Sequence, residues 1–255
     1  LKDRYEILKS LDIAKEVQQK LLPHGVPTID GLDIAGKSIY CDQTGGDYID
    51  FIDTQIEGNR TQIIAIGDVS GHGVPSALLM ASARAFLRQR LALSGTLDQI
   101  INDVNVQFCN DVQQTGRFMT LFVCALDLSK YTLKWIRAGH DPALLYDPTV
   151  DEFSELKQGG GIPLGIDETY IYQESTVPKN TFKSGQILFI GTDGIWESRN
   201  ENKEMFGKER VKKIIRENKD VKAQKIMAEL LDALDTFMGS IVHSDDVTLI
   251  VVKIQ

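Results

Sequence analysis

The sequence predicts an α+β protein in which mainly antiparallel sheets are covered on the outside by helices. Strand-like apolar runs dominate from residue 32 onward, and helical segments rich in Ala, Leu and Met interrupt them in blocks. Strands and helices do not alternate regularly, as they would in a doubly wound parallel sheet. The 255 residues, of which 42% are hydrophobic, suffice for one large domain and a short appendage.

Apolar runs and turn residues define the expected elements. Pro75 suits the first turn of the helix that follows it. Strands are expected at 34–40, 48–53, 61–66, 118–128, 133–137, 143–146, 186–190 and 247–254. Helices are expected at 1–22, 76–93, 97–113, 208–217 and 223–238.

The first helix ends before Pro23 and carries an apolar stripe at helical spacing. This stripe consists of Ile7, Leu11, Ala14, Val17 and Leu21. It is equally compatible with packing on its own domain and with a homodimer or coiled-coil seam. Because the sequence begins at Leu1 rather than Met, we expect a fragment of a longer protein. Residues 1–24 would form a linker helix, and residues 25–255 the main domain.

Bulk properties exclude several classes of protein. A net charge of -8 argues against nucleic-acid binding, which needs a basic surface. No run approaches the roughly 18–20 apolar residues of a membrane helix, and no signal peptide is visible, so we expect no membrane contact. The three cysteines, Cys41, Cys109 and Cys124, are odd in number and lack CxxC spacing, which favours a reducing, cytoplasmic setting.

Four aspartate-containing segments lie where an apolar strand meets a turn. GGDY opens one strand at Asp47, and GDVSGHG closes another at Asp68. GTDG closes a third at Asp193, and SDDVT opens the last at Asp245 and Asp246. A single strand-end aspartate is usually a turn former or a helix cap. Four in the same context favour a shared site, where converging carboxylates would repel one another without a cation. Oxygen ligands without His or Cys suit Mg²⁺ or Mn²⁺.

The segments GGDY, GDVSGHGVPSALLMA, RFMTLFVCALDL, AGHDPALL, GTDGIWE and DDVTLIVV resemble, in order, the SpoIIE/RsbU-like branch of the PPM (type 2C) protein phosphatases. The resemblance covers roughly residues 40–255, and the combination of motifs is specific. It implies a four-layer α/β-β/α sandwich, with two ions of Mn²⁺ or Mg²⁺ at one end.

Carried over by resemblance, Asp68 matches the aspartate that bridges both metals. Val69 takes the position whose backbone carbonyl coordinates metal, and Asp193 matches the ligand aspartate of TDG. Asp47 matches a metal-site aspartate of GGDY. We expect Asp47, Asp68 and Asp193 to be essential for catalysis.

The last metal ligand is expected at Asp245, with Asp246 as a close second. His72 could protonate a leaving serine oxygen, but a local turn role is favoured, because its spacing from the aspartate differs from that in Asp-Gly-His relatives. His140 is expected to be structural. No arginine could be matched to the phosphate-gripping arginine of eukaryotic relatives.

The resemblance implies a serine/threonine phosphatase in which a metal-activated water attacks phosphorus directly. Its substrate would be a phosphorylated STAS-type anti-anti-sigma protein of a bacterial regulatory pathway, and an upstream sensor or receiver domain would act through the linker helix. One alternative is a catalytically silent sigma-regulator-binding module of the same fold. Another is a hydrolase for a small phosphoester, which is disfavoured because no nucleotide-cradling glycine loop with its lysine is present.

Overall fold

The computed structural model describes residues 2–23, 25–127, 129–130, 132–177 and 182–255. Leu1 and His24 of the predicted linker, Leu128 at the end of a predicted strand, and the side chain of Ile7 lie outside the described residues.

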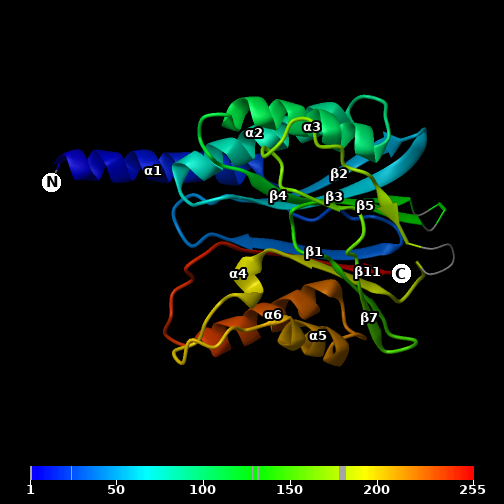
Figure 1. The fold of residues 1–255 in the computed structure, drawn as a ribbon. Coiled ribbons are helices and arrows are strands. Elements are labelled where there is room, and N and C mark those ends of the chain that lie inside the picture. The colour runs from blue at the N-terminus through cyan, green and yellow to red at the C-terminus, as the bar shows by residue number, and fades with distance from the viewer. Residues whose placement is uncertain (1, 24, 128, 131, 178–181) are drawn as a thin grey trace.

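Two sheets stack face to face, and helices cover both outer faces (Figure 1). One sheet has five strands in the order β1 (Leu32–Ile39), β11 (Val247–Ile254), β10 (Ile187–Gly191), β6 (Leu144–Asp147) and β7 (Glu152–Glu155). The other follows the order β2 (Asp47–Ile56), β3 (Asn59–Val69), β4 (Met119–Asp127), β5 (Thr132–Ala138) and β8 (Gly160–Gly161), with β9 (Ser175–Thr176) also paired to β5. The helices are α1 (Lys2–Leu21), α2 (Val74–Leu91), α3 (Leu97–Val112), α4 (Asp193–Trp196), α5 (Lys208–Glu217) and α6 (Ala223–Met238).

Three apolar layers hold these four layers of backbone together. Met80, Leu87 and Phe108 of α2 and α3 pack on the six-stranded sheet. A second layer joins α5 and α6 to the five-stranded sheet, and a third, which includes Phe122 and Ile190, fills the space between the sheets. The predicted α+β four-layer sandwich is therefore confirmed.

Local sequence accounts for the turns between these elements. Glu57 and Gly58 have φ values of 51° and 77°, which produce the tight turn of the β2–β3 hairpin. Thr96 and Gln99 form a capping box at the start of α3, and Pro75 lies in the first turn of α2.

All eight predicted strands and all five predicted helices are present, with ends shifted by up to three residues. The sequence missed β7, β8, β9 and α4, which have two to four residues each. Segments this short cannot display a hydrophobic period. The β8 strand pairs in parallel with β5, so the six-stranded sheet is mainly rather than wholly antiparallel.

Helix α1 projects from one end of the sandwich (Figure 1). Its predicted apolar stripe is unevenly covered: Leu11, Ala14 and Leu21 are half-buried, whereas Val17 is 55% exposed. The residue that follows, Leu22, joins the core under α2. The homodimer seam therefore stays a prediction.

No helix among the described residues is long and apolar enough to span a bilayer. The three cysteines are all unpaired, and Cys109 and Cys124 are buried.

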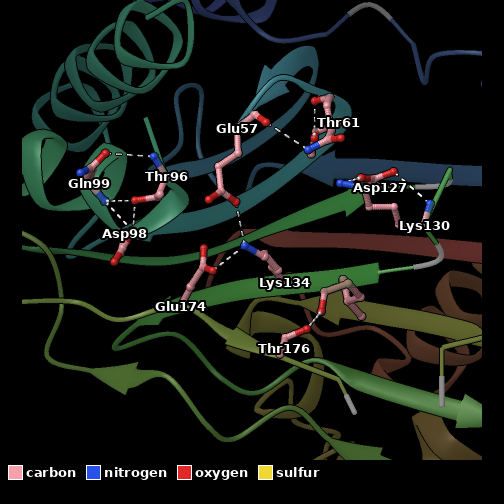
Figure 2. A network of polar contacts seen from close by, with 12 residues as sticks. Glu57, Thr61, Thr96, Asp98, Gln99, Asp127, Lys130, Lys134, Glu174 and Thr176 are labelled. Atoms are coloured by element: carbon pink, nitrogen blue, oxygen red, sulfur yellow. Dashed lines mark hydrogen bonds and ion pairs between the residues drawn. The ribbon is translucent and has the colours of Figure 1, made fainter. Parts of the chain in front are cut away.

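The end of the sandwich at the β2–β3 turn is held by Lys134 of β5. Its ammonium donates to Glu57 at 3.1 Å and to Glu174 at 2.6 Å, which ties the hairpin turn to the segment before β9 (Figure 2). A cavity of about 820 Å³ lies at this end, between the hairpin turn and the α2–α3 connection. Asp47 is at the opposite end of β2, about 30 Å away along the strand.

A buried ion pair fastens α2 to the six-stranded sheet. The side chain of Asp50 is fully buried and accepts two hydrogen bonds from Arg88, each of 2.6 Å. The Tyr48 hydroxyl donates to the same carboxylate at 2.8 Å. A second Arg–Asp pair, Arg60 with Asp53, joins β2 and β3 at the surface, where the side chains are 82% and 55% exposed.

We predict that Arg88→Met lowers the free energy of unfolding by about 3 kcal/mol, because Asp50 would keep a buried charge without its cation. The matched Arg60→Met should cost about 1 kcal/mol or less, because exposed ion pairs contribute little. Chemical denaturation of both variants measures the difference. Equal losses would show that burial does not distinguish the two pairs.

Candidate metal centre

The strand ends that carry the predicted aspartates meet at one end of the sandwich, the end at which α4 lies (Figure 1). Asp47 opens β2 and is paired in register with Asp68 near the end of β3. Asp193 opens α4 two residues after the end of β10, and Asp245 lies two residues before the start of β11. A direct contact joins the two sheets here, since the Thr192 hydroxyl donates to Asp47 Oδ2 at 3.1 Å.

The electrostatics of Asp68 also reflect this convergence. Burial, together with the negative charges of Asp193, Asp245 and Asp246, raises the pKa of its carboxyl to about 7. The carboxylates on the side of the five-stranded sheet are therefore close enough to Asp68 to disfavour its ionised form.

Asp47 is almost completely buried, with 1% of its surface exposed. Burial, reinforced by the Asp68 carboxylate, raises the pKa of Asp47 well above its usual range. The Thr192 hydroxyl opposes this shift by donating to the ionised form. The sequence motif GTDG contained Thr192, but its role could not be read without the fold.

A backbone carbonyl joins these carboxylates. A Cβ on Gly46 would lie 2.6 Å from the Val69 carbonyl oxygen and 3.2 Å from Asp68 Oδ1. Glycine at position 46 thus leaves room for the carbonyl and the carboxylate to lie side by side. The Val69 N–H in turn donates to the Gly46 carbonyl at 3.3 Å.

Asp193 and Asp245 provide the accessible part of the cluster. Asp193 keeps much of its side chain open to solvent, yet partial burial and the nearby Asp245 charge raise its pKa. Asp245 is exposed, and its Oδ1 accepts from the Asp246 N–H at 2.9 Å. Asp246 itself is buried, with 4% exposed, and faces the chain between β1 and β2.

His140 lies buried between the two sheets beside the cluster. Its Nδ1 contacts Thr120 Oγ1 at 2.9 Å, and its Nε2 contacts the Gly191 carbonyl at 3.2 Å. A carbonyl only accepts, so Nε2 carries the proton and Nδ1 accepts from the threonine. Burial lowers the pKa of His140 to about 4, so the ring is neutral near pH 7. Thr120 pairs with Asp68, so this histidine cross-links the two sheets at the site.

His72, by contrast, does not join the two sheets. Its side chain is 77% exposed, and its Nδ1 lies 3.5 Å from Asp42. Arg117, which the sequence did not suggest, donates from Nη1 to the Ser70 carbonyl at 2.5 Å and to Ser76 Oγ at 3.1 Å. It thereby fastens the loop that follows Asp68 and Val69.

Helix α1 reaches the same end of the sandwich. The buried Gln18 donates to the Gly45 carbonyl at 2.6 Å, and its Oε1 accepts from the Gly45 N–H at 3.2 Å. These two bonds attach α1 to the segment that precedes Asp47. Nothing in the sequence pattern indicated this contact across 27 residues.

The five aspartates have an open arrangement. Within the described ranges, no three His, Cys, Asp or Glu side chains form a ready-made metal cage, and no lysine or arginine forms an ion pair with any of the five. The donor set is nevertheless one that suits a hard cation. It combines carboxylates with raised pKa values and a backbone carbonyl, and Mg²⁺ characteristically keeps several waters rather than an all-protein shell.

Comparison with known proteins assigns the family. The family model for stage II sporulation protein E (SpoIIE) matches residues 58–255. This chain belongs to the SpoIIE family. It falls in the branch of PPM-type phosphatases that includes RsbU, and it is a phosphatase.

Among curated members of this family, the phosphoserine phosphatase RsbU of Bacillus subtilis (strain 168) is 29% identical over 248 residues, which cover 97% of this chain and 71% of RsbU. The SiaA-PP2C domain of Pseudomonas aeruginosa has the same fold, with a TM-score of 0.85 at 21% identity and 99% of each chain covered. RsbX in complex with magnesium gives a TM-score of 0.64 at 15% identity, over 90% of this chain and 98% of RsbX.

The raised pKa of Asp68 predicts a pH-dependent stability of the metal-free protein. An aspartate ordinarily titrates near 4, so the folded state holds this proton more tightly than the unfolded state does. The stabilising contribution of this proton is complete below about pH 4 and is lost as pH rises through about 7. In chelator, Asp68→Asn should therefore melt above the wild type by a margin that grows between pH 5.5 and 8.

The difference in melting temperature between the variant and the wild type removes pH effects that both proteins share, including the effect of His140. Asp53→Asn, at the exposed end of the same hairpin, should show a constant margin over this range. A margin for Asp68→Asn that did not change with pH would contradict the assigned pKa.

Proposed function

We propose that this domain is a divalent-metal-dependent phosphatase acting on phosphoserine or phosphothreonine of a STAS-type anti-anti-sigma protein. The observation that carries the proposal is the gathering of Asp47 and Asp68 from one sheet with Asp193 and Asp245 from the other, without a paired cationic side chain among the described residues. The relationship to RsbU, a phosphoserine phosphatase, supports the substrate class.

Two ions of Mn²⁺ or Mg²⁺ would be held by a set of oxygen donors: the carboxylates of Asp47, Asp68, Asp193 and Asp245 and the Val69 carbonyl. Bound there, such ions supply an activated water and neutralise charge on the transferring phosphoryl group. The related RsbX crystallised in complex with magnesium, which supports a cation of this kind.

Each residue of the cluster has a separate task in this scheme. Asp68 lies centrally in the cluster: it is paired with Asp47 across the hairpin, and the charge of Asp193 raises its pKa. Asp47 is buried, and the hydrogen bond from Thr192 fixes the orientation of its carboxylate, so it would provide the buried, rigid side of the metal site. Asp193 and Asp245 are exposed and face the side from which a phosphorylated partner would approach.

We further propose that residues 1–24 act as a switch linker to an upstream sensor or receiver domain. The two hydrogen bonds between Gln18 and Gly45 support this role, because any movement of α1 would act on the segment that leads into Asp47. Dimerisation through α1 is one way in which such a movement could be imposed.

A catalytically silent binding module of the same fold is the main alternative. Such a module would have no need for carboxylates whose pKa values are raised by burial and, in addition, by their mutual repulsion. The accumulated negative charge therefore favours an enzyme.

We predict that phosphate release from a phosphorylated STAS protein requires Mn²⁺ or Mg²⁺ and stops in chelator. Asp68→Asn and Asp193→Asn should each lower turnover by more than about 100-fold, because changes in outer-shell residues alone cost about 10- to 100-fold. The exposed Asp53→Asn should keep a near wild-type rate, since its side chain takes no part in the proposed chemistry.

Turnover that persists in chelator, or that survives both aspartate substitutions, would rule out this mechanism. A wild-type protein that binds the phosphorylated STAS protein but releases no phosphate with either metal would support the silent module instead.

The switch-linker proposal is tested with two neighbouring glutamines. Gln18 is buried on Gly45, whereas Gln19 is exposed. Gln18→Ala should lower turnover about tenfold at limiting Mn²⁺, with partial recovery at high Mn²⁺, because the segment before Asp47 loses an anchor. Gln19→Ala should behave as the wild type in the same assay, and equal effects of the two changes would remove the basis for a switch.

A further inference from the structure

The pair Asp245–Asp246 combines two neighbouring carboxylates with opposite surroundings. Asp245 is exposed, whereas Asp246 is buried, with 4% of its surface exposed. Both Asp246 oxygens are occupied by backbone donors. Oδ1 accepts from the Cys41 N–H at 2.9 Å, and Oδ2 accepts from the Gly46 N–H at 2.9 Å.

These two donors lie at the two ends of one irregular segment, residues 41–46, which connects β1 to β2. The segment has no sheet ladder to hold it, so its N–H groups depend on side-chain acceptors. One carboxylate that bonds both ends clamps the whole segment. Charge-assisted hydrogen bonds of this kind are roughly twice as strong as neutral ones.

Close packing on both sides of Asp246 reinforces the clamp. A Cβ on Gly45 would lie 2.2 Å from Asp246 Oδ2, so only glycine lets the carboxylate approach here. A Cβ on Gly194 would lie 1.9 Å from the Asp246 carbonyl oxygen. Asp246 is thus wedged between the segment that leads into Asp47 and the turn that carries Asp193.

A short chain of bonds leads from this clamp to the metal-site groups. Asp246 holds the Gly46 N–H, and the Gly46 carbonyl accepts from the Val69 N–H at 3.3 Å. Gly46 directly precedes Asp47, and Val69 directly follows Asp68. A shift of Gly46 would therefore displace both Asp47 and the Val69 carbonyl.

We propose that Asp246 is a positioning residue, which clamps residues 41–46 and thereby sets Asp47 and the Val69 carbonyl, and that Asp245 alone of the pair faces the cation. This assignment rests on the proposed metal-dependent function. It gives separate roles to two carboxylates that the sequence could only rank as first and second choice for the same ligand position.

The test compares Asp246→Asn with Asp245→Asn in the full 255-residue chain, first without metal. An asparagine at 246 can accept only through its one oxygen, so at least one of the Cys41 and Gly46 amides loses its acceptor. By NMR hydrogen exchange in chelator, that amide should exchange about 10- to 100-fold faster. Asp245→Asn should leave both amides at wild-type rates.

The second measurement is the affinity of each variant for Mn²⁺, obtained by titration. Both variants should bind Mn²⁺ more weakly, but only Asp246→Asn should also loosen the metal-free segment. Unchanged exchange at Cys41 and Gly46 in Asp246→Asn, together with lost Mn²⁺ binding, would overturn the proposal and make Asp246 a ligand. A wild-type protein without phosphatase activity would refute the proposed function while leaving the exchange result for the clamp intact.

If Asp246→Asn does not fold, the wild-type protein alone provides the test. Adding Mg²⁺, which is diamagnetic, should leave exchange at Cys41 and Gly46 as slow as before or slower. Faster exchange at these two amides on adding Mg²⁺ would mean that the carboxylate leaves them for the cation, and the proposal would be wrong.

Discussion

Repulsion between carboxylates brought together from two sheets is the constraint on which the rest of this structure depends. Asp47 and Asp68 are paired across the β2–β3 hairpin, and the charges of Asp193 and Asp245, on the side of the five-stranded sheet, act on Asp68. Among the described residues, no lysine or arginine side chain pairs with them. Burial in such a place is unfavourable for an ionised carboxylate, and the raised pKa values of Asp47, Asp68 and Asp193 express that cost.

The surrounding fold holds these groups in place against their repulsion. Three apolar layers fix the stacking of the sheets, and contacts at the site end fix it locally. Neutral His140 joins the strand beside Asp68 to the end of β10, and Thr192 joins the start of α4 to Asp47. Arg117 and Gln18 fasten the two loops that flank the cluster. His140, Thr192 and Gln18 are uncharged, and the Arg117 guanidinium donates to the Ser70 carbonyl and to Ser76 rather than to one of the aspartates. These contacts therefore do not neutralise the cluster.

Much of this arrangement could be predicted from the sequence. Long apolar runs and helical stripes marked every long strand and helix, because their periods extend over many residues. The four aspartate segments were recognisable, because each combines an apolar strand with a turn. The fold and family followed from the order of these motifs, and both are confirmed. The ligand roles of Asp47, Asp68, Val69, Asp193 and Asp245 remain predictions that the structure makes testable.

Contacts between distant parts of the chain could not be predicted. Gln18 and Gly45 are 27 residues apart, and Asp246 is 205 residues from Cys41. No local pattern distinguishes Asp246 from Asp245, because their difference lies in which backbone donors surround each carboxylate. The unequal exposure of the two histidine side chains is likewise a product of tertiary packing, although their turn and structural roles were anticipated.

The sharing of the site between both sheets has a thermodynamic consequence. A ligand that contacts both Asp68 of β3 and Asp193 at the start of α4 binds only while the two sheets are stacked, so its binding free energy stabilises the layer between the sheets. Residues such as Phe122 and Ile190 in that layer would then resist opening more strongly as the free cation concentration rises. An ion bound at the proposed site would therefore stabilise the stacked sheets, and its removal would lower the free energy of unfolding of the domain.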